Sequence, residues 1–155
     1  MDMELQDKVA LITGATSGIG RATARRFAAA GAKVMAVGRD ETALAELGSE
    51  ISGSGGEFAP ATIDLAVDGS AQTLVDRAVD TYGGMDILVN AAGTLKSGTI
   101  QTTTITDWDA MMNINLRSIF QLMNAAMPQL AARAGNVVNV SSFTPTCARE
   151  ITPSP

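Results

Sequence analysis

Short, mostly apolar runs alternate along the chain with longer segments in which apolar residues recur every three or four positions. The first pattern is typical of strands in a parallel sheet, and the second is typical of helices that cover such a sheet. Glycines such as Gly31 and Gly83-Gly84 separate the segments. The predicted strands are 9–12, 33–37, 57–63, 87–90 and 136–140, and the predicted helices are 19–30, 41–51, 70–82 and a long one, capped at 106 or 107, that runs to 127 or beyond.

This alternation predicts a single α/β domain. Strand–helix–strand units with short connections form parallel sheets covered on both faces, and their crossovers are right-handed. We therefore expect a Rossmann-like, doubly wound parallel sheet of five strands in the order 3-2-1-4-5. The carboxyl ends of the strands then meet at one edge, where a ligand crevice forms. The segments that reach this edge are 13–20, 38–39, 64–65, 90–93 and 141–142, and all are polar or glycine-rich.

The segment after the first strand has the chemistry of a phosphate site. It reads Thr13-Gly-Ala-Thr-Ser-Gly-Ile-Gly20 and leads into a predicted helix. Unpaired N–H groups and the dipole at a helix N-terminus favour an anion, and glycines allow a pyrophosphate to approach the backbone. An ordinary strand-to-helix connection is the alternative interpretation. The candidate cofactor contacts here are Gly14, Thr16, Ser17, Gly18, Ile19 and Gly20.

Composition and charge narrow the classes of function. The chain has 155 residues, of which 46% are hydrophobic and 17% charged, as in globular proteins. A net charge of −5 without a basic run argues against a nucleic-acid partner, and no apolar run reaches the length of a membrane span. The acidic N-terminus does not resemble a signal peptide, and the single cysteine, Cys147, fits a reducing compartment. We expect a soluble cytoplasmic protein without a metal site.

Four motifs, taken together, resemble the short-chain dehydrogenase/reductase family of the classical type. Residues 13–20 match its Thr-Gly-x-x-x-Gly-x-Gly motif, and residues 90–93 match its Asn-Asn-Ala-Gly motif except at Ala91. Residues 115–120 resemble the asparagine motif of its middle helix, and residues 135–142 resemble its fifth strand. The resemblance covers residues 5 to about 142. It implies an oxidoreductase that transfers a hydride between a nicotinamide cofactor and the carbon of a carbonyl or alcohol substrate.

The resemblance also implies cofactor contacts beyond the glycine turn. Asp64 would accept from the adenine amino group, and the alternative is that it caps the following helix. Asn90 would join neighbouring strands while the small residues after it let the cofactor ribose approach, and a plain turn is the alternative there. The candidates in these two segments are Asp64, Leu65, Asn90, Ala91, Ala92 and Gly93.

Arg39 indicates which dinucleotide is bound. An acid at the end of the second strand accepts from the ribose 2′-OH of NAD, whereas a cation favours the 2′-phosphate of NADP. Here positions 38 and 39 are glycine and arginine, and Asp40 comes too late and fits the start of the next helix. We therefore expect NADP rather than NAD. The alternative is that Arg39 is an ordinary surface cation.

By the same resemblance, Ser142 and Asn115 are the candidate catalytic residues. The Ser142 hydroxyl would hydrogen-bond the substrate oxygen, with Ser141 as the alternative. Asn115 would help to hold a water in a proton relay, with Asn113 as the alternative. An asparagine within a helix costs helix propensity, so Asn115 is expected to have a specific partner.

The proton donor of the family is absent from this sequence. It is a tyrosine in a Tyr-x-x-x-Lys motif, expected at 154–156, and the chain ends at Ser154-Pro155. The one tyrosine, Tyr82, fits a core position on the third helix. We therefore expect residues 1–155 to form one dinucleotide-binding domain, truncated before that helix and lacking the C-terminal part of the family fold.

Two hypotheses about function follow. In the first, the chain is part of an NADP(H)-dependent oxidoreductase acting on a small carbonyl or alcohol substrate, with the tyrosine and lysine lying beyond residue 155. In the second, it is a catalytically inactive dinucleotide-binding module that associates with other subunits. Apolar residues surround most of the long helix, as in helices buried on several sides. We therefore expect a homo-oligomer, a dimer or tetramer, assembled through residues 107–133.

Overall fold

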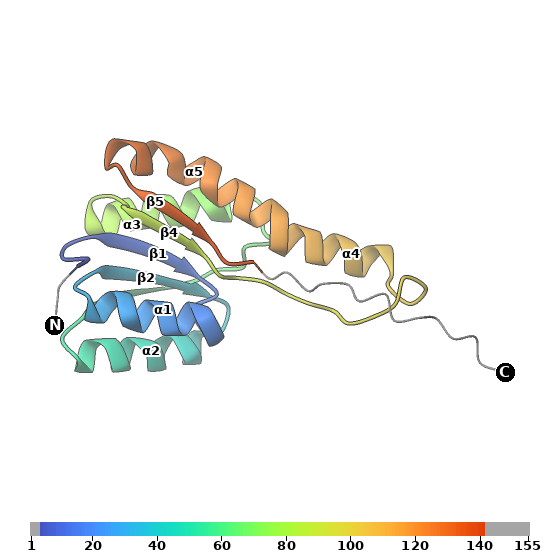
Figure 1. Ribbon diagram of the computed structural model, residues 1–155, viewed down its shortest axis with the longest axis horizontal. Coiled ribbons are helices and arrows are strands. Elements are labelled where there is room, and N and C mark those ends of the chain that lie inside the picture. Colours follow the sequence, from blue (N-terminus) through green and yellow to red (C-terminus); the bar gives the residue numbers. More distant parts are fainter. Residues whose placement is uncertain (1–3, 142–155) are drawn as a thin grey trace.

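A five-stranded parallel sheet forms the centre of the computed structural model, which describes residues 4–141 (Figure 1). All four strand pairs are parallel, and the order β3-β2-β1-β4-β5 is the one predicted. The predicted Rossmann-like fold is thereby confirmed. The strands are β1 (Val9–Thr13), β2 (Lys33–Gly38), β3 (Glu57–Thr62), β4 (Ile87–Asn90) and β5 (Asn136–Asn139).

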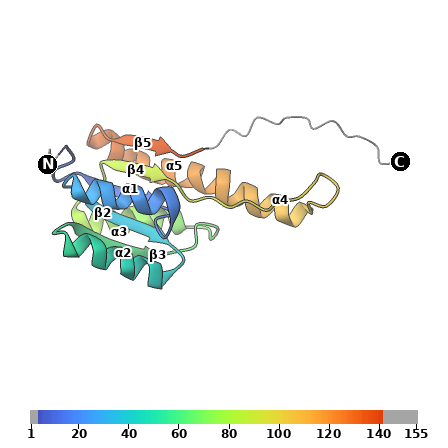
Figure 2. The ribbon, with the colours of Figure 1, turned by 60° about the horizontal axis from the view of Figure 1, so that its bottom comes forward.

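Helices cover both faces of the sheet (Figures 1 and 2). Helices α1 and α2 pack together on one face, and α3 and α5 pack together on the other. The predicted long helix is in fact two α-helices joined by a π-helix, η1. The helices are α1 (Gly18–Ala29), α2 (Glu41–Gly53), α3 (Ser70–Tyr82), α4 (Ile105–Met112), η1 (Asn113–Arg117) and α5 (Ser118–Ala132).

Strand β1 separates two hydrophobic cores. Its five residues are all buried, and successive side chains point to opposite faces. Leu11 joins the core beneath α3 and α5, whereas Ile12 joins the core beneath α1 and α2. This explains why the strand reads as a continuous apolar run rather than an alternating one.

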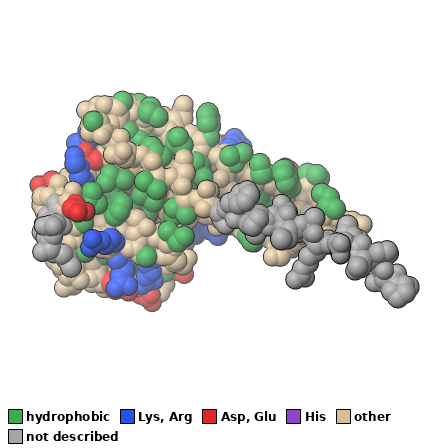
Figure 3. Space-filling model, in the orientation of Figure 1, with side chains coloured by type: hydrophobic (Ala, Val, Ile, Leu, Met, Phe, Trp, Pro, Cys, Tyr) green, Lys and Arg blue, Asp and Glu red, His purple; other side chains and the backbone are tan. Residues whose placement is uncertain are grey.

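Helix α4 projects beyond the sheet (Figures 1 and 2). None of its residues is buried in the part of the chain that the structure describes. The cap is Thr104 rather than the predicted 106 or 107, because Thr104 and Asp107 form a reciprocal capping box. Figure 3 shows hydrophobic side chains gathered along the projecting helices. The exposed large ones on α4, η1 and α5 are Ile105, Trp108, Met112, Leu116, Phe120 and Met127.

A buried carboxylate joins three segments at the amino-terminal edge of the sheet. Asp86 is 6% exposed and accepts from the backbone N–H of Val9 at 2.9 Å. Arg133, which follows α5, lies 3.3 Å from the same carboxylate and donates to the Gly83 carbonyl at 2.7 Å. Lys8 lies 3.6 Å away on the other oxygen. The cluster fixes the start of β1 and β4 against the end of α5, at the edge opposite the predicted crevice.

Across residues 4–141, no helix has both the length and the hydropathy needed to span a lipid bilayer.

Candidate functional site

A pocket of about 650 Å³ lies along the carboxyl-terminal edge of the sheet. Its walls come from the segments after β1, β2, β3 and β4 and from α4 and η1. This is the edge at which the sequence predicts a crevice. Twelve of the predicted site residues line it together: Gly14, Thr16, Ser17, Gly18, Ile19, Gly20, Arg39, Asp64, Leu65, Ala91, Ala92 and Gly93.

The other three predicted site residues are not among those that line the pocket. Asn90 and Asn115 lie next to the pocket without lining it. Ser142 lies outside the described residues. Gly38, in the predicted crevice segment, and Asn113, the alternative to Asn115, also line the pocket. Further lining residues were not predicted as site residues: Val37, Ile63, Ala66, Thr94, Ala110, Ile114 and Val140.

The glycines of the first turn shape the pocket in two ways. A Cβ on Gly14 would come within 2.7 Å of the Ala91 carbonyl oxygen, and a Cβ on Gly20 would collide with Gly14 itself. Gly14 also has a φ of +66°, where other residues are strained. Gly18 shares the positive φ, at +51°, but a Cβ there would meet no described atom within 4 Å. Gly14 and Gly20 are therefore needed for close packing, while Gly18 borders open space.

Helix α1 begins in this pocket. Ser17 is its N-cap residue, and within the described chain the Ser17 side chain forms no cap hydrogen bond. The first N–H groups of a helix have no partners within the helix, and its N-terminus carries a partial positive charge. The turn therefore offers unpaired donors, a serine hydroxyl and room at Gly18 to an anionic group. These are the features that a diphosphate requires.

Thr13 joins the ends of β1 and β4 beneath the pocket. Its buried hydroxyl accepts from the backbone N–H groups of Ala91 and Ala92, each at 3.1 Å, and lies 3.4 Å from the Val89 carbonyl oxygen. Thr13 belongs to the glycine motif but was not among the predicted site residues. A hydroxyl residue directly after a buried apolar run was the available signal. The Thr13 hydroxyl holds two walls of the pocket at a fixed separation.

Arg39 lies on the pocket wall directly after β2. Its side chain is exposed and takes part in no ion pair with the residues that the structure describes. Asp40 is the N-cap of α2 and accepts from the Ala43 N–H at 3.0 Å, as the sequence predicted. The residue that follows β2 in the pocket wall is therefore a cation, and the acid next to it, Asp40, is engaged as a helix cap.

Asp64 closes the turn that follows β3. One of its carboxylate oxygens accepts from the Ala66 N–H at 2.9 Å. The alternative role as the cap of α3 is wrong, because Gly69 is the N-cap of that helix. Asp64 nonetheless lines the pocket, which leaves it beside any ligand bound there.

Asn90 is buried at the end of β4, where it is 1% exposed. Its amide nitrogen donates to the Asn139 side-chain oxygen at 2.8 Å and so joins β4 to β5. Its own side-chain oxygen has no hydrogen-bond partner among residues 4–141. A direct contact with a cofactor stays a prediction, since the residue is set behind the pocket wall.

The two candidate asparagines of the middle helix lie in η1. Asn115 makes two 2.8 Å hydrogen bonds to the backbone of Thr94: its oxygen accepts from the N–H, and its nitrogen donates to the carbonyl. Thr94 is therefore the specific partner that the sequence predicts for Asn115. Asn113 lines the pocket and donates to the Ala66 carbonyl at 3.3 Å. The two residues therefore hold two different walls of the same pocket.

Tyr82 is half-buried at the far edge of the sheet. Its hydroxyl lies 3.5 Å from the Val34 carbonyl oxygen, and its ring packs against the core. Burial raises the pKa of the phenol to about 12, and the negative charge of Glu57 adds to the increase. A phenol with this pKa and position is a poor proton donor for the pocket, in keeping with the predicted core role.

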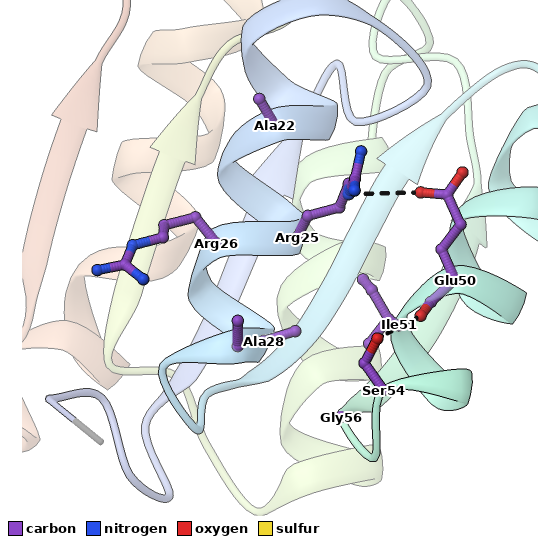
Figure 4. Close-up of a pocket in the computed structure, with 9 residues that line it drawn as sticks. Ala22, Arg25, Arg26, Ala28, Glu50, Ile51, Ser54 and Gly56 are labelled. Atoms are coloured by element: carbon purple, nitrogen blue, oxygen red, sulfur yellow. Dashed lines mark hydrogen bonds and ion pairs between the residues drawn. The ribbon is translucent and has the colours of Figure 1, made fainter. Parts of the chain in front are cut away.

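A second, smaller pocket of about 380 Å³ lies between α1 and α2 (Figure 4). Arg25 pairs with Glu50 at 3.5 Å, while the side chain of Arg26 points the other way. The polar groups that line this second pocket therefore do not converge on a common point. The structure also brings together no group of three or more His, Cys, Asp or Glu side chains able to hold a metal ion within residues 4–141.

Known proteins share this sequence pattern. A family model described as short chain dehydrogenase matches residues 8–150. An uncharacterized oxidoreductase of Staphylococcus saprophyticus is 35% identical over 144 residues, which cover 92% of this chain and 62% of that protein. A 3-oxoacyl-[acyl-carrier-protein] reductase of Thermotoga maritima is 38% identical over 141 residues, which cover 90% of this chain and 57% of that protein.

Solved structures share the fold. A metagenomic short-chain oxidoreductase crystallised in complex with NADP superposes with a TM-score of 0.85 at 34% identity, over 90% of this chain and 64% of that one. A putative short-chain dehydrogenase/reductase from Burkholderia xenovorans gives a TM-score of 0.83 at 34% identity, over 87% of this chain and 56% of that one. The chain thus spans between 56% and 64% of the length of these four proteins.

Proposed function

The chain belongs to the short-chain dehydrogenase family, and from this premise we propose that it binds NADP(H) along the carboxyl-terminal edge of its sheet. In the whole protein, this site would serve hydride transfer to or from a small carbonyl or alcohol substrate. One observation carries the proposal: twelve residues selected from four separate segments of sequence converge on one pocket of about 650 Å³.

The glycine turn is the proposed diphosphate site. The N-terminus of α1 opens there, and the free space at Gly18 lets a ligand oxygen approach the backbone. The nearby Ser17 hydroxyl is a further donor. Because Gly14 and Gly20 pack against backbone, the turn can keep its shape without a ligand and needs little reorganisation on binding.

The adenine half is proposed to extend from this turn toward β2 and β3. Arg39 would bind the 2′-phosphate that distinguishes NADP from NAD, and Asp64 and Leu65 would border the adenine. The nicotinamide half would then extend over the small residues Ala91, Ala92 and Gly93, toward β5. The NADP bound in the related metagenomic structure supports the class of cofactor, without deciding between NADP and NAD here.

For the chemical step, bound NADP(H) would supply or accept the hydride. Ser142 is the proposed partner of the substrate oxygen, with Ser141 as the alternative. Asn115 would act by fixing Thr94, next to the nicotinamide side of the pocket. Tyr82 is ill suited as the proton donor of this site, because its hydroxyl lies beside Val34 at the far edge of the sheet and its pKa is raised to about 12.

The second hypothesis, a nucleotide-binding module within an assembly, draws on the exposed apolar side chains. Trp108 is 53% exposed, Leu116 60% and Phe120 69%, and all three lie on α4, η1 and α5. Large apolar surfaces of this kind mark interaction sites. We therefore propose a homo-oligomer assembled through residues 107–133. With a single cysteine in the sequence, a cytoplasmic location remains the prediction.

Titration with NADPH and NADH, followed by calorimetry, tests the cofactor proposal directly. We expect saturable 1:1 binding of NADPH, at least about tenfold tighter than NADH, which corresponds to about 1.4 kcal/mol. Binding of neither dinucleotide at millimolar concentration would overturn it. Tighter binding of NADH would overturn the assignment of Arg39 while leaving the pocket in place.

A further inference from the structure

The π-helix η1 contacts two opposite walls of the pocket. Asn113 donates to the Ala66 carbonyl in the loop after β3, and Asn115 is bonded to Thr94 in the loop after β4. An i→i+5 turn is rare and is frequently found at functional sites. Here it carries two asparagines that bond to two different loops. The bonded residues of these loops, Ala66 and Thr94, are 28 positions apart in the sequence.

We propose that Asn113 is a positioning residue for the adenine half of the dinucleotide. It would act through the Ala66 carbonyl by holding the loop between β3 and α3 against the pocket. The inference rests on the proposed function, because it presupposes that a dinucleotide occupies this pocket. It assigns to Asn113 a task separate from that of Asn115.

The loop after β3 needs such a tether. At its start the Ile63 N–H donates to the Gly38 carbonyl at 3.0 Å, and Leu65 is buried in the core. Beyond these anchors its own hydrogen bonds are short-range: Asp64 accepts from Ala66, and the Val67 N–H donates to the Asp64 carbonyl at 3.2 Å. These bonds fix the turn but not its distance from the opposite wall. A second connection, Arg117 to Asp68 at 3.0 Å, joins two exposed side chains and so contributes little. The partly buried Asn113 is the tether that also lines the pocket.

Chain topology determines which half of the ligand each asparagine serves. The glycine turn follows β1, at the centre of the sheet, and the order places β2 and β3 on one side and β4 and β5 on the other. With Arg39 and Asp64 on the first side, the adenine half lies there and the nicotinamide half lies toward Thr94. Asn113 therefore serves the adenine half and Asn115 the nicotinamide half.

The experiment compares two ligands across matched variants of the chain. The ligands are NADPH and 2′,5′-ADP, which contains the adenine half alone. The variants are Asn113→Ala, Asn113→Asp and Asn115→Ala. Asn124→Ala is the control, because Asn124 is exposed on α5 and lies outside the pocket. Circular dichroism and the melting temperature without ligand report folding for each variant.

We expect Asn113→Ala to weaken 2′,5′-ADP about three- to tenfold, the effect of losing one hydrogen bond that orders a binding loop. Asn113→Asp should weaken it at least as much, because it keeps the size of the side chain, removes the N–H donor and adds a negative charge beside an anionic ligand. Asn115→Ala should weaken NADPH more than 2′,5′-ADP. Asn124→Ala should change neither ligand by more than about twofold, a change of about 0.4 kcal/mol.

The inference is overturned if folded Asn113→Ala or Asn113→Asp binds 2′,5′-ADP as the parent chain does. It is also overturned if Asn115→Ala weakens 2′,5′-ADP as much as Asn113→Ala does, which would indicate that both asparagines have a general structural role. If the parent chain binds neither ligand, the proposed function itself fails.

Discussion

The region around β1 is buried, whereas the region around β5 is largely exposed. Every residue of β1 and β4 is buried, whereas no residue of β5 is buried within the described chain, and Val138 is 47% exposed. The helices differ in the same way. Helix α3 buries five residues against the sheet, while α4 buries none. One region is covered by its own chain, and the other presents apolar side chains to its surroundings.

This difference separates two tasks. The proposed dinucleotide pocket is built mainly on the covered region, where Gly14 packs against the Ala91 backbone and the Thr13 hydroxyl is bonded to the residues after β4. The exposed side chains lie on α4, η1 and α5, where a partner could cover them. Burial of each Å² of apolar surface contributes about 25 cal/mol. The π-helix connects the two regions, since it bonds to the pocket walls and also carries the exposed Leu116.

The largest expected effect is the contrast in stability between the two regions. Leu88→Ala should lower the free energy of unfolding by about 3 kcal/mol, because Leu88 is fully buried in β4 and its loss leaves a cavity. Phe120→Ala should change it by less than about 0.5 kcal/mol, since that ring is 69% exposed. Urea denaturation at low protein concentration measures both. Equal losses would show that the second region is packed as firmly as the first.

A glycine comparison comes next. Gly14→Ala should weaken NADPH about thirtyfold, or about 2 kcal/mol, because a Cβ at this positive φ would press on the backbone of Ala91. Gly53→Ala is the matched control: its Cβ would meet no described atom within 4 Å, and alanine favours the helix. Calorimetric titration of both variants with NADPH measures the two dissociation constants. Unchanged binding by Gly14→Ala would contradict the proposed diphosphate site.

Arg39 tests the specificity of the pocket. Arg39→Ala should weaken NADPH about tenfold and NADH less than about twofold, since only NADPH carries the 2′-phosphate. Arg25→Ala is the control, an exposed arginine in the pocket between α1 and α2. The ratio of the two dissociation constants, measured at one salt concentration, is the readout. A parallel loss for both dinucleotides would assign Arg39 to general electrostatics.

The smallest effect concerns Tyr82 at alkaline pH. Its pKa is raised from 10.0 to about 12 in the folded chain, so the unfolded chain loses the phenol proton first. Tyr82 therefore stabilises the fold below pH 10, and this contribution falls progressively between pH 10 and 12. Tyr82→Phe should flatten that part of the stability curve. If urea unfolding of the parent and the variant shows the same pH dependence, the phenol is not shielded as described.

The sheet order and the pocket were predictable because both depend on local pattern. Alternating strands and helices constrain the sheet, and residues after parallel strands meet at one edge. The glycine spacing was equally informative, although only Gly20 packs against its own turn, while Gly14 packs against Ala91 in the loop after β4. The role of Asp40 as a helix cap followed from its position alone.

The middle of the long helix was less predictable. Apolar spacing shows which residues share a face, but not whether another element covers that face, so the exposure of Trp108 could not be deduced. The π-turn coincides with tertiary bonds from Asn113 and Asn115 to distant loops, which a local pattern does not reveal. Asp64 posed a similar problem, because a carboxylate before a helix can close a turn or cap the helix, and the intervening residues decide which.

The π-turn between α4 and α5 has a geometric consequence for the outer surface. Such a turn holds one residue more than an α-turn, and each residue advances an α-helix by about 100°. Deleting a single residue from Asn113–Arg117 would therefore swing Trp108 about a quarter of the way around the axis relative to Phe120. The one extra residue sets the phase between the two helices, and with it the contour that this side of the molecule offers to a neighbour.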